Sequence, residues 1–262
     1  MAISKVTDAS LTKQNRLWLL SSEWRFEAGF GLIAGMQRLL EGVHKFRQDE
    51  FGRYKAMFKR LSRHGQKPHT LFITCADSRV LAELITQSNP GDLFVIKNVG
   101  NIVPSASIAE GFNSTGAGIE FAVEVLGVSD VVVCGHSGCG AIAALMSRQS
   151  DWTLKHLHSW VELAKPVREL IESKYQHLTD AEERARAAEE ENVLFSIEQL
   201  HTYPCVERRL ADGTLRLHAW FFKIGTGELF AYDPEQNGFM AITGDTTFLS
   251  GSEAGRGEVG GK

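Results

Sequence analysis

Residues 71–79 read LFITCADSR and residues 130–140 read DVVVCGHSGCG, and these two stretches decide the fold. Each opens with a short apolar or β-branched run, which is typical of a strand covered on both faces. A third run of this kind, residues 93–96, follows an Asn-Pro-Gly-Asp turn, and a helical pattern occupies residues 118–126. Strands that alternate with helices at this spacing predict an α/β domain with a parallel, or mostly parallel, sheet flanked by helices.

The flanking sequence predicts three further elements. Apolar residues recur at steps of three and four between residues 32 and 61, which indicates an amphipathic helix pair. Residues 180–200 are rich in Glu, Arg and Ala and carry an apolar stripe from Val193 to Leu200, which predicts a helix. Residues 215–224 and 229–232 flank a Gly-Thr-Gly turn and are interpreted as a closing hairpin.

Length and composition predict one domain with two extensions. The 262 residues are 43% hydrophobic, enough for one core of somewhat above average size. We expect an N-terminal arm over residues 1–34, a single α/β domain over residues 35–249 and a disordered, glycine-rich tail over residues 250–262.

Charge, hydropathy and cysteine content exclude several classes of partner. The formal net charge is −4, so no broad positive field is present to hold nucleic acid. No apolar run approaches the roughly 18 residues of a membrane span, and no secretory leader is recognised at the N-terminus. Four cysteines are too few for a disulfide scaffold in a chain of this length, which predicts a reducing, cytoplasmic setting.

Three of the polar residues that follow the predicted strands can hold a metal ion. Cys75 follows the first strand, and His136 and Cys139 follow the strand at residues 131–134. Loops at the carboxyl ends of strands in an open α/β sheet line one crevice, so these segments can converge. Two thiolates and one imidazole suit Zn²⁺, and we predict one ion per chain.

Three protein ligands leave a tetrahedral zinc ion with one open position, which is the mark of a catalytic site. Bound water there becomes acidic, although two thiolates are expected to make it less acidic than three imidazoles would, so activity should rise from neutral to alkaline pH. Asp77 can either ligate the ion or pair with Arg79 and turn away. Gly135, Gly138 and Gly140 are expected to permit tight turns and close approach to the ion.

The combination Cys75-x-Asp77-x-Arg79 and His136-x-x-Cys139-Gly140 resembles the β-class carbonic anhydrases. Similar segments run from about residue 36 to residue 242, or roughly four fifths of the chain, and residues 36–42 look most like the cyanobacterial, carboxysome-associated branch. Lys97 stands where Arg is common in relatives.

The resemblance implies a four-stranded parallel sheet with one added strand and an N-terminal helical arm across a partner subunit. It also implies a homodimer, or a larger homo-oligomer built from dimers, with the active site at the dimer interface. Cys75, His136 and Cys139 would be the zinc ligands, and Asp77 and Arg79 the catalytic pair. Zinc-bound hydroxide would convert CO2 reversibly to bicarbonate and a proton. Gln66 would help to hold substrate, and carboxysome proteins are possible partners.

Several alternatives remain open on sequence. The same site could act on CS2 or COS, or the zinc could stabilise a non-catalytic scaffold protein in which Asp77 closes the site. Ser137 lies in the start of a nucleophile elbow, and residues 138–143 fit a dinucleotide-binding pattern, but neither has the partner residues it needs. Cys134 and Cys205 are interpreted as buried small residues, and Glu189 to Glu191 as a solvated helix face.

Overall fold

A computed structural model describes residues 30–109, 113–147 and 153–243. The chain divides into two compact units after Lys59, within a helix. The first unit is helical throughout its described part, which confirms the helical pattern predicted there. Its elements, the last of which continues into the second unit, are α1 (Phe30–Lys45), η2 (Phe46–Glu50) and α2 (Phe51–His64). The predicted tail and most of the predicted arm lie outside the described residues, so the domain bounds stay a prediction.

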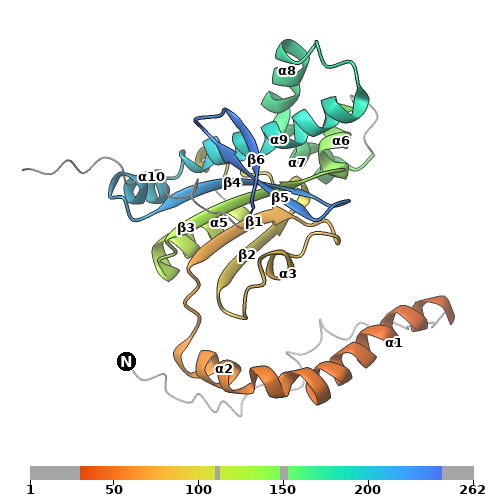
Figure 1. Ribbon diagram of the computed structural model, residues 1–262, viewed down its shortest axis with the longest axis vertical. Helices are drawn as coiled ribbons and strands as arrows, with labels where there is room; N and C mark the ends of the chain where they lie inside the picture. The colour runs from red at the N-terminus through yellow and green to blue at the C-terminus, as the bar shows by residue number, and fades with distance from the viewer. Residues whose placement is uncertain (1–29, 110–112, 148–152, 244–262) are drawn as a thin grey trace, which may run out of the picture. The chain divides into compact units, whose positions relative to one another are not determined.

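The second unit is built on a six-stranded sheet with the order β2-β1-β3-β4-β5-β6 (Figure 1). The strands β2, β1, β3 and β4 are parallel to one another. The strand β5 pairs antiparallel with β4, and β6 pairs antiparallel with β5. The strands are β1 (Thr70–Cys75), β2 (Leu93–Asn98), β3 (Asp130–His136), β4 (Arg216–Lys223), β5 (Glu228–Asp233) and β6 (Gly238–Ala241). The mostly parallel sheet and the closing hairpin are therefore confirmed, but two antiparallel strands follow the parallel core, whereas the resemblance implied one.

Strand register sorts the side chains onto the two faces of the sheet. Leu71 and Ile73 pair with Val131 and Val133, and all four are fully buried in the main core cluster against one layer of helices. Residues between them point to the other face, because side chains alternate along a strand. There Phe72 packs edge-on against Trp220 of β4, with ring centroids 6.0 Å apart.

Helices cover the sheet and position the loops at its carboxyl edge. The longest, α9 (Ala181–Leu200), begins at Asp180, whose carboxylate accepts hydrogen bonds from the next turn, and it packs along β3 and β4. The others are α3 (Ala82–Thr86), η3 (Val99–Asn101), α4 (Ala106–Ala109), α5 (Ser114–Glu120), η4 (Phe121–Leu126), α6 (Gly140–Met146), α7 (Lys155–Val161), η5 (Glu162–Ala164), α8 (Lys165–Lys174) and α10 (Pro204–Ala211). None of the helices described is both long and apolar enough to cross a membrane.

The close contact between β3 and α9 depends on Gly135. A methyl group added at Gly135 would lie 2.5 Å from Cγ2 of Val193 and 3.5 Å from the carbonyl oxygen of Glu189. Val193 is fully buried and β-branched, so it cannot swing aside without moving the helix.

Replacing Gly135 with Ala is therefore expected to lower the free energy of unfolding by about 1–3 kcal/mol, the usual cost of overpacking a core. Urea denaturation of the two proteins measures the difference. Gly225→Ala is the matched control, because a methyl group there meets nothing within 4 Å and the backbone is not left-handed. Equal midpoints for Gly135→Ala and the unsubstituted protein would contradict the expectation.

Candidate metal centre

Cys75, His136 and Cys139 converge at the carboxyl edge of the sheet. Cys75 ends β1, His136 ends β3, and Cys139 is the residue before the first turn of α6. Because β1 and β3 are adjacent and parallel, their carboxyl ends meet, and the three ligand atoms lie within 4.8 Å of one another. The three residues are only 6%, 1% and 2% exposed. The structure thus brings together the three residues that the sequence predicted as ligands.

His136 presents a free lone pair to this cluster. Its Nδ1 lies 3.1 Å from the carbonyl oxygen of Ser137, and because a carbonyl can only accept, Nδ1 is the protonated nitrogen. Nε2 then carries the lone pair, is buried, and has no hydrogen-bond partner among the described residues. A buried, unpaired imidazole nitrogen beside two thiols is the arrangement of a metal ligand whose other nitrogen is fixed by the backbone.

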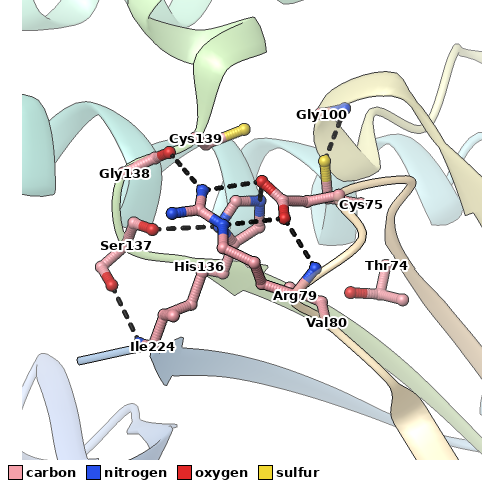
Figure 2. Close-up of polar contacts among 12 residues, drawn as sticks. Thr74, Cys75, Arg79, Val80, Gly100, His136, Ser137, Gly138, Cys139 and Ile224 are labelled. Atoms are coloured by element: carbon pink, nitrogen blue, oxygen red, sulfur yellow. Dashed lines mark hydrogen bonds and ion pairs between the residues drawn. The ribbon is translucent and has the colours of Figure 1, made fainter. Parts of the chain in front are cut away.

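The two thiols are poised to bind a cation. The Sγ of Cys75 accepts a hydrogen bond from the backbone N–H of Gly100 at 3.3 Å (Figure 2). The neighbouring thiol of Cys139 lowers the pKa of Cys75 to about 4, and the pKa of Cys139 is raised in turn by its contact with Cys75 and by burial. Ionisation of Cys75 is therefore favoured over ionisation of Cys139. The donor set and its spacing fit Zn²⁺, because zinc–sulfur bonds of about 2.3 Å place two sulfurs of a tetrahedron about 3.8 Å apart.

Asp77 and Arg79 form a bidentate pair beside the cluster. Arg79 donates from Nε to Oδ1 of Asp77 at 3.0 Å and from Nη2 to Oδ2 at 2.8 Å, and its backbone N–H also reaches Oδ1 at 2.9 Å. These bonds hold the pKa of Asp77 well below its usual range, so the carboxylate is ionised. Oδ2 of Asp77 is also 4.0 Å from Nε2 of His136. The carboxylate thus lies beside the three ligands while it remains tied to Arg79.

Arg79 also joins the two loops that supply the ligands. Its Nη2 donates to the carbonyl oxygen of Gly138 at 3.1 Å (Figure 2), and Gly138 has a left-handed φ of 68° that favours glycine. Ser137 makes two hydrogen bonds to β4 and the turn after it. Its N–H donates to the carbonyl oxygen of Phe222, and its hydroxyl accepts from the N–H of Ile224, both at 3.0 Å. Ser137 therefore fastens the loop to the sheet.

The three glycines of the second motif have different surroundings, and their close approach to an ion stays a prediction. A methyl group at Gly140 would meet nothing within 4 Å among the described residues, and the backbone there is not left-handed. At Gly135 the crowding comes mainly from Val193 and Glu189 of α9. Only Gly138 has the turn geometry that was expected of all three.

Glu189 is a site residue that the sequence interpretation missed. The acidic run was expected to be solvated, but Glu189 is only 5% exposed, and its Oε1 accepts a hydrogen bond from the backbone N–H of Cys139 at 2.7 Å. Burial raises its pKa, and the bond from Cys139 partly offsets this. The helical period of the sequence could have predicted that Glu189 is buried, because Glu189 lies one turn before Val193 on the buried stripe that continues to Leu200.

Gln66 lies away from the ligands of its own chain. It is exposed and precedes β1, whereas the cluster lies beyond the other end of that strand. A strand of this length spans roughly 20 Å, so the length of β1 separates Gln66 from the cluster of its own chain. Cys134 and Cys205 are buried outside the cluster, and burial raises the pKa of Cys134 to about 12, as expected of structural cysteines.

Comparisons with known proteins identify the family. A family model described as carbonic anhydrase matches residues 70–229, more than half of the chain. A carbonic anhydrase from Synechocystis sp. is 43% identical over 207 residues, which cover 79% of this chain and 74% of the relative. A carbonic anhydrase from Pseudomonas aeruginosa is 40% identical over 207 residues, with coverage of 79% and 92%.

A solved structure shares both the fold and the sequence. The β-carbonic anhydrase CcaA has a TM-score of 0.75 to this chain at 41% identity, covering 81% of this chain and 94% of that one. The similarity therefore extends over the sheet, the helices and the loops that bring the two thiols and the imidazole together. The chain belongs to the β-class carbonic anhydrases.

Proposed function

We propose that this enzyme holds one Zn²⁺ per chain through Cys75, His136 and Cys139 and uses it to convert CO2 and water reversibly to bicarbonate and a proton. The observation that carries the proposal is the position of Asp77. Its Oδ2 lies 4.0 Å from the free nitrogen of His136, yet both carboxylate oxygens are bonded to Arg79. A carboxylate held in this way leaves the fourth position of the ion to a water molecule.

Bound there, Zn²⁺ would lower the pKa of a water molecule towards about 7 and so supply a nucleophile near neutral pH. The chain supplies the orientation. Arg79 occupies one side of each oxygen of Asp77, so the remaining lone pairs of Oδ2 can accept a hydrogen bond from the reacting water. This hydrogen bond to Asp77 would aim the water oxygen at the carbon of CO2, and the proton lost from the water would leave to solvent.

Two other functions compete for the same residues. A scaffold role predicts a closed site in which Asp77 is the fourth ligand, and the two bonds from Arg79 to Asp77 argue against it. Action on CS2 or COS would use the same three ligands, and no feature of the described residues favours these substrates over CO2.

We further propose that the enzyme is a homodimer or a larger homo-oligomer. The distance of Gln66 from the ligands of its own chain supports this, because its predicted role in holding substrate then requires a second subunit. A solved relative from Sordaria macrospora, 32% identical with a TM-score of 0.62, is described as tetrameric. A cytoplasmic setting, and association with a carboxysome, stay predictions.

Stopped-flow measurement of CO2 hydration tests the proposed function. We expect rapid, zinc-dependent proton release at about pH 8.5, lost when the metal is removed by chelation and regained when zinc returns, and rising between neutral and alkaline pH. A protein with bound zinc that releases protons no faster than buffer would contradict the proposal, and CS2 would then be the next substrate to assay.

A further inference from the structure

We propose that Lys97 is a positioning residue that clamps the loop bearing Asp77 and Arg79, and so keeps Asp77 from closing the metal site. The inference rests on the proposed zinc centre and deepens it. It assigns a role to a side chain that touches neither the three ligands nor the carboxylate of Asp77 in the contacts described.

Lys97 joins the two ends of a tight turn. The turn runs from Asp77 to Val80 and is closed by a hydrogen bond from the N–H of Val80 to the carbonyl oxygen of Asp77 at 3.2 Å. The Nζ of Lys97 donates to that same carbonyl oxygen at 3.1 Å and to the carbonyl oxygen of Val80 at 2.6 Å. A single ammonium group therefore bonds to the backbone on both sides of Arg79, and bonds from a charged donor are stronger than neutral ones.

Strand register explains why Lys97 reaches the backbone of the loop. Thr74 pairs with Lys97, and Cys75 pairs with Asn98, at the carboxyl ends of the adjacent strands β1 and β2. Paired residues of parallel strands point to the same face, and successive residues point to opposite faces. Lys97 therefore leaves the sheet on the face opposite to Cys75, next to the point where the chain turns out of β1.

The remaining end of the turn is fixed by packing. The side chain of Val80 is fully buried, so this end of the turn is anchored in the protein interior. Asp77, at the other end, has its main chain held by Lys97 and its side chain held by Arg79, whose own side chain is 52% exposed. The bonds from Arg79 hold mainly the carboxylate of Asp77, whereas the bonds from Lys97 add a restraint on the main chain at both ends of the turn.

The restraint on this loop matters because the carboxylate of Asp77 is close to a position from which it could bind the ion. Oδ2 of Asp77 lies 4.0 Å from Nε2 of His136, so a small shift of the loop would bring this carboxylate to a metal ion held there. A divalent cation attracts the carboxylate strongly, and a closed fourth position admits neither water nor an added anion. Loss of the clamp should therefore convert open sites into closed ones.

Azide binding to the cobalt-substituted enzyme tests the proposal without turnover. Co²⁺ in place of zinc gives a visible spectrum that changes when an anion takes the open position. In Lys97→Met, we expect azide to bind at least about tenfold more weakly than in the unsubstituted enzyme, and kcat to fall by a similar factor, the usual effect of losing a residue that orients a metal site. Lys97→Gln, whose neutral and shorter side chain can donate only weaker bonds to these carbonyl oxygens, should change in the same direction.

Lys165→Met is the matched control, because Lys165 is exposed on α8 and pairs with Glu169 one turn away at 3.2 Å. It should bind azide as the unsubstituted enzyme does. The decisive comparison adds Lys97→Met to Asp77→Asn. If Lys97 acts through Asp77, the added substitution should change azide affinity less than twofold, since an amide competes poorly for the ion.

Two results would overturn the role of Lys97. One is an azide affinity that is unchanged in Lys97→Met and Lys97→Gln. The other is that Lys97→Met weakens azide binding by the same factor in the Asp77→Asn protein as in the protein that keeps Asp77. The proposed function is tested by a different measurement. It fails if the zinc-loaded, unsubstituted enzyme hydrates no CO2, whereas azide binding reports whether the fourth position of the ion is open, whatever the substrate is.

Discussion

Replacing Cys139 with Ser is expected to remove zinc and activity together. Serine preserves the size of the side chain, but its hydroxyl does not ionise near neutral pH and is a poor ligand for zinc. The free energy of binding of structural zinc is about 10–16 kcal/mol and is shared among a few ligands, so each ligand contributes several kcal/mol. The affinity for zinc should therefore fall by about a thousandfold or more. The hydrogen bond from the backbone N–H of residue 139 to Glu189 does not depend on the side chain, so the loop should keep its shape.

Metal analysis after dialysis, with CO2 hydration on the same samples, measures this result. Cys205→Ser is the matched control, because Cys205 is also a buried cysteine, 8% exposed, but lies outside the ligand cluster. It should keep one zinc per chain and full activity. Retention of stoichiometric zinc by Cys139→Ser at limiting metal would exclude Cys139 as a ligand.

Replacing Asp77 with Asn is expected to lower kcat by about a hundredfold or more while zinc content stays near one per chain. The amide keeps the shape of the side chain but loses the charge that pairs with Arg79 and accepts the hydrogen bond from the reacting water. Removal of a group that orients a metal-bound reactant typically costs 10–100-fold, and here the pair with Arg79 is lost as well. Stopped-flow assays with metal analysis separate this effect from loss of zinc.

Asp130→Asn is the control for loss of an ion pair as such. The side chain of Asp130 is 17% exposed, as is that of Asp77, and it bonds to both Nε and Nη2 of Arg216 at 2.8 and 3.0 Å. Asp130 begins β3, whereas the metal cluster lies at the other end of that strand. Asp130→Asn should reduce stability and leave kcat nearly unchanged. A fully active Asp77→Asn enzyme would exclude the proposed role of Asp77.

Local sequence predicted the fold well where the pattern was strong. The β-branched and apolar runs of β1 and β3 lie in the centre of the sheet, and the apolar stripe from Val193 to Leu200 predicted the buried face of α9. The sequence did not predict β6, which is four residues long and has two exposed residues. Short strands at a sheet edge bury little apolar surface, so their sequences show little pattern.

The candidate ligands and their partners were predictable because their spacing is local or because they end strands. Cys75, Asp77 and Arg79 are each two positions apart, and such close spacing limits which side chains can meet. The roles of Glu189 and Lys97 were not predictable in this way. Lys97 lies 17 and 20 residues from the two loop residues it contacts, and Glu189 lies 50 residues from Cys139. Both are of residue types that are usually solvated.

The sequence by itself therefore determined the parallel core, the candidate metal ligands and the Asp77–Arg79 pair, since each depends on contacts along the strand or on the order of strands in the sheet. Only the tertiary structure decided that Glu189 is buried against Cys139 and that Lys97 bonds to the turn after β1. The physical reason is that burial and long-range hydrogen bonds are set by which elements pack together. A charged residue gives no local sign of whether it will face water or the backbone of a neighbouring strand.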